Sequence, residues 1–165
     1  MESCEDVGYH EAGHAIGAIK LKIGLDSKGI QRQSPCDGMT YVQELHEGRN
    51  EEWCIRRAAV KLSGPAAECR YRNQFYSFET LASEPHYFGD YKEAEQILQS
   101  YHSQVGSPNP LRLEELLLTA LKLAEEVVSD NWHVIKEVAR ASQQEPRLTA
   151  EKILSIIHTA EGSSV

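Results

Sequence analysis

Residues 6–21 read DVGYHEAGHAIGAIKL, and this stretch decides how the first part of the chain folds. Its apolar residues recur at helical spacing, which predicts one helix from about Asp6 to Leu21. Gly24 and Asp26 follow and are expected to end it. Small side chains at Ala12, Gly13 and Ala15 leave room for close packing along this helix.

The same helix carries His10-Glu11-Ala12-Gly13-His14, which fits the pattern H-E-x-x-H. Histidines four positions apart lie on one helix face, so both imidazoles can reach one zinc ion. Glu11 stands beside the first histidine and can act as general base toward a water. The alternative is a surface helix with two solvated histidines. We interpret the motif as a zinc site.

Two histidines leave a catalytic zinc site one protein ligand short, because such a site holds three protein ligands and a water. The third ligand can come from anywhere in the fold, so spacing does not select it. The candidates with suitable side chains are Glu44, His46, Glu47, Glu84, His86 and Asp90. His86 is also a candidate for stabilising an oxyanion beside the metal.

The rest of the chain predicts a mostly α fold with a small two- or three-stranded sheet near the N-terminal half. Alternating and β-branched residues favour strands at 29–33 and 39–45 around a turn. Asn50 is expected to cap a helix that Gly64-Pro65 interrupts, and a further helix should begin near Asp90. Other expected elements are an irregular stretch at 73–89, helix in one or two pieces over 111–143, and a last helix capped by Thr149. Residues 1–165 are expected to form a single domain.

Composition restricts the partners of the chain. Its formal net charge of −8 argues against binding to a nucleic-acid backbone, which needs clustered Lys and Arg. No apolar run approaches the ~20 residues that span a bilayer, and the acidic N-terminus lacks the plan of a signal peptide. Four widely spaced cysteines favour reduced thiols and a cytoplasmic location.

Several segments resemble the peptidase domain of the FtsH-type ATP-dependent zinc proteases, and the resemblance spans nearly the whole chain. Residues 9–15 (YHEAGHA) resemble the metal-binding helix of that family, and residues 38–42 (GMTYV) resemble its G-x-T-x strand. Residues 62–68 (LSGPAAE) and 89–94 (GDYKEA) are similar to its G-G-R-A-A-E and N-D-L-x-x-A segments. The run from Ala124 through residues 148–153 (LTAEKI) resembles its closing helices.

This resemblance implies that His10, His14 and Asp90 bind Zn²⁺ and that Glu11 is the base. The alternative for Asp90 is an ordinary helix N-cap. Pro65 departs from the family, which has arginine there, and the segment at 107–110 is altered. Without a fused ATPase, we expect ATP-independent cleavage of flexible or unfolded polypeptides, unless a separate ATPase or delivery partner supplies substrate.

The sequence therefore predicts a zinc metallopeptidase. We expect the strand over 39–45 to be a sheet edge to which an extended substrate adds by backbone pairing, with Thr40, Tyr41 and Val42 as substrate-binding residues. An internal strand is the alternative. A catalytically silent, zinc-stabilised protein-binding module is the rival function, which Glu11 argues against because a structural site needs no base. A zinc hydrolase acting on another bond is a third possibility.

Overall fold

The computed structural model describes residues 4–34, 36–43, 50–106 and 110–162. Within these ranges the chain is mostly helical and carries one small antiparallel sheet. The elements are α1 (Cys4–Lys20), β1 (Leu25–Ser34), β2 (Asp37–Val42), α2 (Glu51–Tyr71), α3 (Phe78–Ser83), α4 (Pro85–Gln104), α5 (Pro110–Asp130), α6 (Trp132–Gln144), β3 (Arg147–Leu148) and α7 (Ala150–Gly162). The predicted fold class is confirmed.

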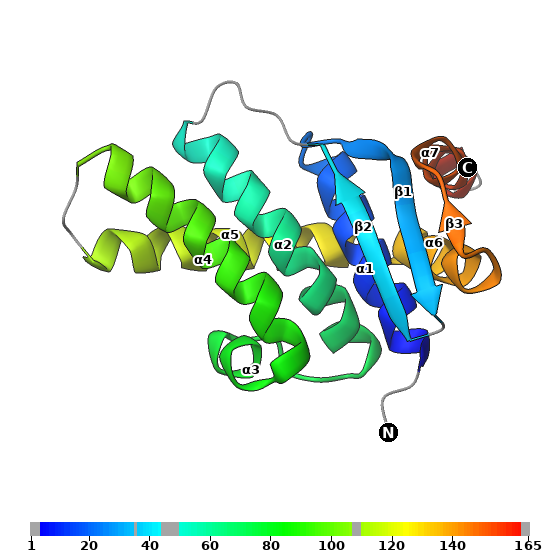
Figure 1. Cartoon of the computed structure of the whole chain (residues 1–165), viewed down its shortest axis with the longest axis horizontal. Helices are drawn as coiled ribbons and strands as arrows, with labels where there is room; N and C mark the ends of the chain where they lie inside the picture. The colour runs from blue at the N-terminus through cyan, green and yellow to red at the C-terminus, as the bar shows by residue number, and fades with distance from the viewer. Residues whose placement is uncertain (1–3, 35, 44–49, 107–109, 163–165) are drawn as a thin grey trace.

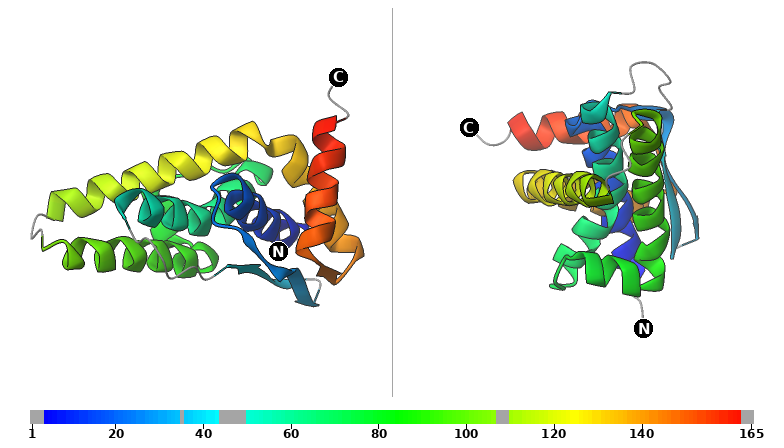
Figure 2. Two further views of the ribbon diagram at one scale, coloured as in Figure 1. Left: turned by 90° about the horizontal axis from the view of Figure 1, so that it is seen from above. Right: turned by 90° about the vertical axis from the view of Figure 1, so that its left-hand side faces the viewer.

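Helices α1 and α2 form the centre of the molecule. The sheet lies in front of α1, and α4 lies beside α2 on the side away from the sheet (Figure 1). Helix α5 runs along the back of α2 and α4, while α6 and α7 pack at the end nearest α1 and β1 (Figure 2). The N-terminal helix is therefore enclosed by elements from the whole chain, and its residues 11–18 are buried.

Glycines allow α1 and α2 to approach closely. A side chain at Gly13 would overlap the backbone carbonyl of Ser63, and one at Gly64 would overlap the ring of His14. Both glycines are buried at the contact, so the α1 backbone at Gly13 lies directly against the α2 backbone at Ser63, and the His14 ring lies against Gly64. This contact sets the depth of the metal motif in the core.

The sheet has the strand order β2-β1-β3, with antiparallel pairing throughout. Among the described residues β2 pairs only with β1, so it is an edge strand, as the sequence predicted. Strand β1 begins earlier than expected, at Leu25, because its paired segment continues past a register shift toward Val42. The end of the second predicted strand, at 44–45, lies outside the described residues.

Strand β3 was not predicted, because two residues carry no readable pattern. It pairs with β1 through Ile30 and Leu148. Gly29 makes this approach possible: its φ is +60°, and a side chain there would overlap the carbonyl of Leu148. The third strand of the sheet is thereby supplied by a segment more than a hundred residues away from β1 in the sequence.

The predicted interruption of the second helix at Gly64-Pro65 is wrong. Helix α2 runs without a break from Glu51 to Tyr71 with Pro65 inside it. A proline in a helix interior removes one backbone hydrogen bond and normally disfavours the helix. Residues 62–69 are all buried here, and tertiary packing overrides this local preference. The predicted cap is confirmed, since Asn50 Oδ1 accepts from the Trp53 backbone N–H at 2.8 Å.

The stretch 73–89 is less irregular than expected. Ser77 caps α3 by accepting from the Thr80 backbone N–H, and α4 begins at Pro85, with Glu84 as its N-cap residue. Asp90 therefore lies inside α4, which excludes the N-cap role considered for it. The pattern misled because proline suits the first helical turn as well as a loop.

Toward the C-terminus, the helical pattern over 111–143 resolves into α5 and α6, joined at Asn131. Thr149 Oγ1 accepts from the Lys152 backbone N–H at 3.4 Å at the start of α7, so the predicted cap is confirmed. No helix of the described residues is long and apolar enough to cross a membrane. The prediction of reduced thiols is wrong for Cys36, which is disulfide-bonded, whereas Cys54 and Cys69 are buried thiols outside any disulfide.

Candidate metal centre

Three predicted ligands converge on one point. His10 and His14 come from one face of α1, and Asp90 comes from the second turn of α4, which packs against α2. His10 Nε2 lies 2.9 Å from Asp90 Oδ2, His14 Nε2 lies 3.0 Å from His10 Nε2, and His14 Nε2 lies 3.5 Å from Asp90 Oδ2. Tetrahedral zinc with bonds of 2.0–2.1 Å separates its ligand atoms by roughly 3.3 Å. Two of the three separations are shorter than this value and one is slightly longer, so the three atoms lie close enough together to share one ion.

The chemistry of the donors fits a cation as well. His14 Nδ1 donates to the backbone carbonyl of Val60 at 2.9 Å, so in the neutral ring Nε2 carries a lone pair. His10 Nδ1 lies 2.9 Å from Glu68 Oε2, which likewise leaves its Nε2 lone pair facing the centre. Two ring nitrogens and a carboxylate oxygen thus point at one another. A shared cation satisfies all three, and hydrogen bonds at the far ring nitrogens are typical of metal-binding histidines.

Glu68 is held in place by charge. Its carboxylate is 4% exposed and forms an ion pair with Arg72, whose Nη2 lies 2.8 Å from Glu68 Oε1. The same Arg72 nitrogen lies 2.8 Å from Asp6 Oδ2 on α1. Burial raises the pKa of Glu68, but His10, Arg72 and His86 outweigh it and lower the pKa below its ordinary value. An ionised Glu68 fixes the orientation of the His10 ring.

In the metal-free protein a proton can take the place of the ion. Burial lowers the pKa of His10, but hydrogen bonds to Asp90 and Glu68 outweigh it and raise the pKa to about 10. Burial likewise raises the pKa of Asp90, while His14 and His10 lower it well below its usual range. Metal-free protein at neutral pH therefore holds His10 as an imidazolium between two carboxylates, so zinc and a proton compete for Nε2.

Glu11, the predicted base, lies on α1 beside this centre and is 6% exposed. Thr40 on β2 contacts it directly: its Oγ1 lies 2.6 Å from Glu11 Oε2 and 2.9 Å from the Glu11 backbone carbonyl. The hydroxyl holds the carboxylate against the edge strand. Thr40 was predicted to bind substrate, which stays a prediction; in the structure its side chain contacts Glu11 and its backbone belongs to the edge strand.

Helix α2 supports the second histidine. The ring of His14 occupies the space that a side chain would fill at Gly64. The His10 and His14 rings meet edge to face, with centroids 4.7 Å apart. The backbone of α2 thus restricts the His14 ring on one face and the Val60 carbonyl fixes its Nδ1. Both histidines are positioned by α2, a helix that contributes no metal ligand.

Two other candidates for the third ligand, His86 and Glu84, are not part of the three-atom group. His86 Nε2 faces Glu68 Oε1 at 3.5 Å and Arg72 Nη1 at 3.4 Å, so it is directed at the charge network and away from the three-atom centre. Glu84 is the N-cap residue of α4. Glu44, His46 and Glu47 lie outside the described residues. His86 nevertheless lines the same 200 Å³ pocket as His10 and Glu11, where its predicted role beside an oxyanion remains a prediction.

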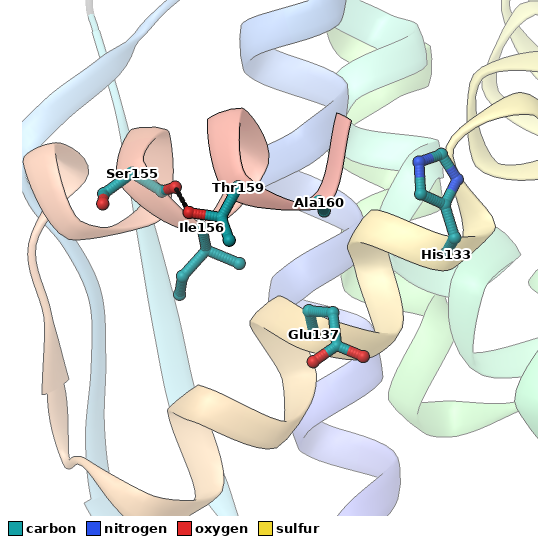
Figure 3. A pocket seen from close by; sticks show the side chains of 6 residues that line it. All are labelled: His133, Glu137, Ser155, Ile156, Thr159 and Ala160. Carbon is teal, nitrogen blue, oxygen red and sulfur yellow. Dashed lines mark hydrogen bonds between the residues drawn. The ribbon is translucent and has the colours of Figure 1, made fainter. Parts of the chain in front are cut away.

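Two further pockets are present in the described residues, one beside the site and one away from it. A pocket of about 450 Å³ runs along β2 and includes Tyr41 and Val42, the other predicted substrate-binding residues. A pocket of about 520 Å³ lies between α6 and α7, and its described lining residues all come from these two helices (Figure 3). Its acid, Glu137, pairs with Arg140 on its own helix at 2.9 Å. Among the described residues, only His10, His14 and Asp90 form a group that could hold a metal ion.

Sequence reasoning missed the residues that support the ligands. Glu68 was quoted only as part of a motif, and Arg72, Asp6 and the Val60 carbonyl were not noticed. One signal was available: Glu68 is a lone acid within an apolar run, Pro65-Ala66-Ala67-Glu68-Cys69. A carboxylate in a buried helix segment needs a partner, and the nearby histidine motif could have supplied it.

A scan of known protein families finds no match for the chain, and a search of curated proteins finds no similar sequence. The function of the chain is therefore inferred from the geometry of its own residues.

Proposed function

We propose that the chain is a zinc-dependent metallopeptidase that hydrolyses peptide bonds in flexible or unfolded polypeptides. The observation that carries this proposal is the convergence of His10, His14 and Asp90 next to a buried glutamate that a threonine hydroxyl orients. A structural metal site has no use for such a base. This arrangement favours a hydrolase over a silent, zinc-stabilised binding module.

Each residue has a distinct part in the proposed reaction. Bound zinc supplies Lewis-acid chemistry: it lowers the pKa of a water toward ~7 and polarises the scissile carbonyl. Glu11 takes a proton from the attacking water and later delivers it to the leaving amine. Thr40 holds the Glu11 carboxylate in position through its 2.6 Å contact. Glu68 keeps His10 Nδ1 protonated, and so its Nε2 free to bind the metal.

The edge strand supports a polypeptide substrate. Strand β2 has one neighbour among the described residues, β1, and its other edge lies beside the 450 Å³ pocket. An extended chain can pair with the free backbone groups of such an edge. Thr40 links this edge to Glu11, so a paired substrate would lie next to the base. Folded proteins offer few extended segments, and the proposed substrates are therefore flexible or unfolded.

The test compares metal content and hydrolysis of casein-derived peptides by the wild type, Glu11→Gln and Glu126→Gln. Glu126 is exposed on α5, so its change is the matched control. We expect near-stoichiometric zinc in all three proteins and cleavage that is lost only in Glu11→Gln and after chelation. Zinc without cleavage of any peptide would favour the binding module or a required ATPase partner. Absence of zinc binding would refute the proposal.

A further inference from the structure

The pocket along β2 has an unusual charge for this protein. It is lined by Asp26, Lys28, Thr40, Tyr41, Val42, Arg57, Val60 and Lys61, which come from β1, β2 and α2. Three cations and one carboxylate line a volume of about 450 Å³ in a chain whose formal net charge is −8. A basic pocket on an acidic protein indicates a ligand of negative charge.

The cations are available to such a ligand to different degrees. Arg57 and Lys61 are four residues apart and share one face of α2. Lys61 Nζ forms an ion pair with Glu93 at 2.6 Å. Lys28 and Arg57, in contrast, have no carboxylate within ion-pair distance among the described residues.

Aromatic rings orient these two cations. Lys28 Nζ lies 4.9 Å from the centre of the Tyr41 ring, and the Arg57 guanidinium lies 5.3 Å from that of Trp53. Asp26 also lines the pocket, but its Oδ1 accepts the backbone N–H of Lys28 at 2.9 Å and forms no ion pair with the Lys28 ammonium or with Arg57 among the described residues. Two cations are thus held at the pocket wall, and within the described parts of the chain neither has a carboxylate at ion-pair distance.

The pocket is also joined to the candidate catalytic centre on two sides. On α2, the backbone carbonyl of Val60 accepts from His14 Nδ1, and Val60 lines the pocket. On β2, Thr40 lines the pocket and contacts Glu11. A peptide paired with the β2 edge would place a side chain near the scissile bond into this space, since alternate residues of a strand point to opposite faces.

We propose that this pocket is a substrate subsite that binds the side-chain carboxylate of an aspartate or glutamate close to the scissile bond, with Arg57 and Lys28 as its specificity-determining residues. The inference rests on the proposed peptidase function and names its substrate class: polypeptide segments with an acidic residue beside the cleaved bond. A guanidinium suits this role because its planar N–H groups match the geometry of a carboxylate.

The experiment uses internally quenched peptides with blocked ends. In each set, one position carries Glu, Gln or Lys and the rest of the peptide is unchanged. Further sets move this variable position along the peptide. Blocked ends ensure that a side chain is the source of the carboxylate. We compare kcat/KM for the zinc-loaded wild type, Arg57→Glu, Lys28→Glu and Lys136→Glu. Lys136 is exposed on α6, so its change alters the net charge equally and is the matched control. Circular dichroism and zinc content verify that each variant is folded and loaded.

We expect the wild type to prefer Glu over Gln by about tenfold at one position. Arg57→Glu should remove this preference and favour Lys, Lys28→Glu should reduce it, and Lys136→Glu should leave it unchanged. High salt should weaken the preference, because exposed charges are screened. Equal cleavage of all peptides, or a Glu preference that persists in both pocket variants, would overturn the subsite and leave the peptidase intact.

Binding separates this inference from the proposed function. The same peptides, labelled with a fluorophore, are titrated into zinc-loaded Glu11→Gln protein and into the Arg57→Glu, Glu11→Gln double variant, and anisotropy is followed. One possible result is that the wild type cleaves no peptide, yet the Glu peptide binds about tenfold tighter than the Gln peptide, and only when Arg57 is present. This result would support the carboxylate-binding pocket and refute the peptidase function. Equal binding of both peptides would refute the subsite.

Discussion

His10 Nδ1 lies 2.9 Å from Glu68 Oε2, a contact between residues 58 positions apart on α1 and α2. It orients the ring, so that Nε2 faces Asp90 and His14. Glu68 is fixed in turn by Arg72, which also reaches Asp6. The candidate ligand His10 is thus oriented by a chain of charged side chains that ends at Asp6, on its own helix.

Replacing Glu68 should weaken zinc binding without removing a ligand. Loss of a partner behind a metal-binding histidine typically costs 10–100-fold in affinity. We expect Glu68→Ala to lower the zinc affinity by a factor in that range. Glu68→Gln should lower the affinity less, because the amide oxygen can still accept a hydrogen bond from His10 Nδ1. The dissociation constant is measured by competition with a chromophoric chelator. Exposed Glu79→Ala is the control, and equal affinity in all proteins would contradict the orienting role.

Adding one methyl group at Gly64 should disturb the site more than the fold. The Cβ of Gly64→Ala would overlap the His14 ring and displace its Nε2. We expect at least a tenfold loss of zinc affinity with helical content largely kept. Gly89→Ala is the matched control, since it lies in α4 next to Asp90 and its Cβ would meet open space. It should be neutral or stabilise the helix by about 0.5–1 kcal/mol; similar effects of both changes would be inconsistent with the close contact.

Zinc binding at neutral pH should release a proton from His10. The pKa of His10 in the metal-free protein is about 10, raised from 6.5, so the ring is charged at pH 7 and must lose its Nε2 proton when the ion binds. Apparent affinity should therefore rise about tenfold per pH unit between pH 7 and 10. Calorimetry in buffers of different ionisation enthalpy counts the protons. Affinity independent of pH would show that His10 is already neutral.

The raised pKa of His10 also makes the stability of the metal-free protein depend on pH. The folded state binds this proton more tightly than the unfolded state. The contribution of His10 to the free energy of unfolding is therefore complete below pH 6.5 and is lost as pH rises through about 10. Denaturant unfolding of chelator-treated protein should accordingly show falling stability over this window. Saturating zinc should diminish the trend, since the bound ion replaces the proton.

Thr40 should affect turnover rather than metal binding. Its hydroxyl contacts the Glu11 carboxylate at 2.6 Å, so Thr40→Val leaves the base unconstrained while keeping the size of the side chain. If the chain is a peptidase, kcat should fall about tenfold, which is only part of the roughly 10²–10⁴-fold that general base catalysis supplies, because the base itself is kept. Thr40→Ser should retain most activity, and zinc content should be unchanged in both. A loss confined to KM would assign Thr40 to substrate binding instead.

Local patterns predicted the parts of this structure that depend on a few neighbouring residues. The helix around His10 and His14 follows from apolar periodicity, and Asn50 and Thr149 cap helices as their side chains allow. The two histidines share a face because helix geometry alone places them there. Their convergence with Asp90 came from a family resemblance, since no spacing rule joins α1 to α4.

Features that depend on distant packing were mispredicted or missed. Pro65 signals a break when read locally, yet the core around 62–69 keeps α2 continuous. Asp90 looked like a helix start because Gly89 precedes it, but α4 had already begun at Pro85. Strand β3 exists only because Gly29 admits it. Each of these is decided by a partner that lies far away in the sequence.

The spacing of the three ligand atoms has a consequence for ion selectivity. Separations of 2.9, 3.0 and 3.5 Å suit an ion with bonds near 2.0–2.1 Å, whereas Ca²⁺ bonds at 2.3–2.6 Å to more numerous oxygen ligands. The donor set at this point consists of two imidazole nitrogens and one carboxylate oxygen. Calcium takes six to eight oxygen ligands, whereas zinc accepts histidine nitrogens readily. Discrimination against Ca²⁺ would therefore come from the kind and number of donor atoms that α1 and α4 supply.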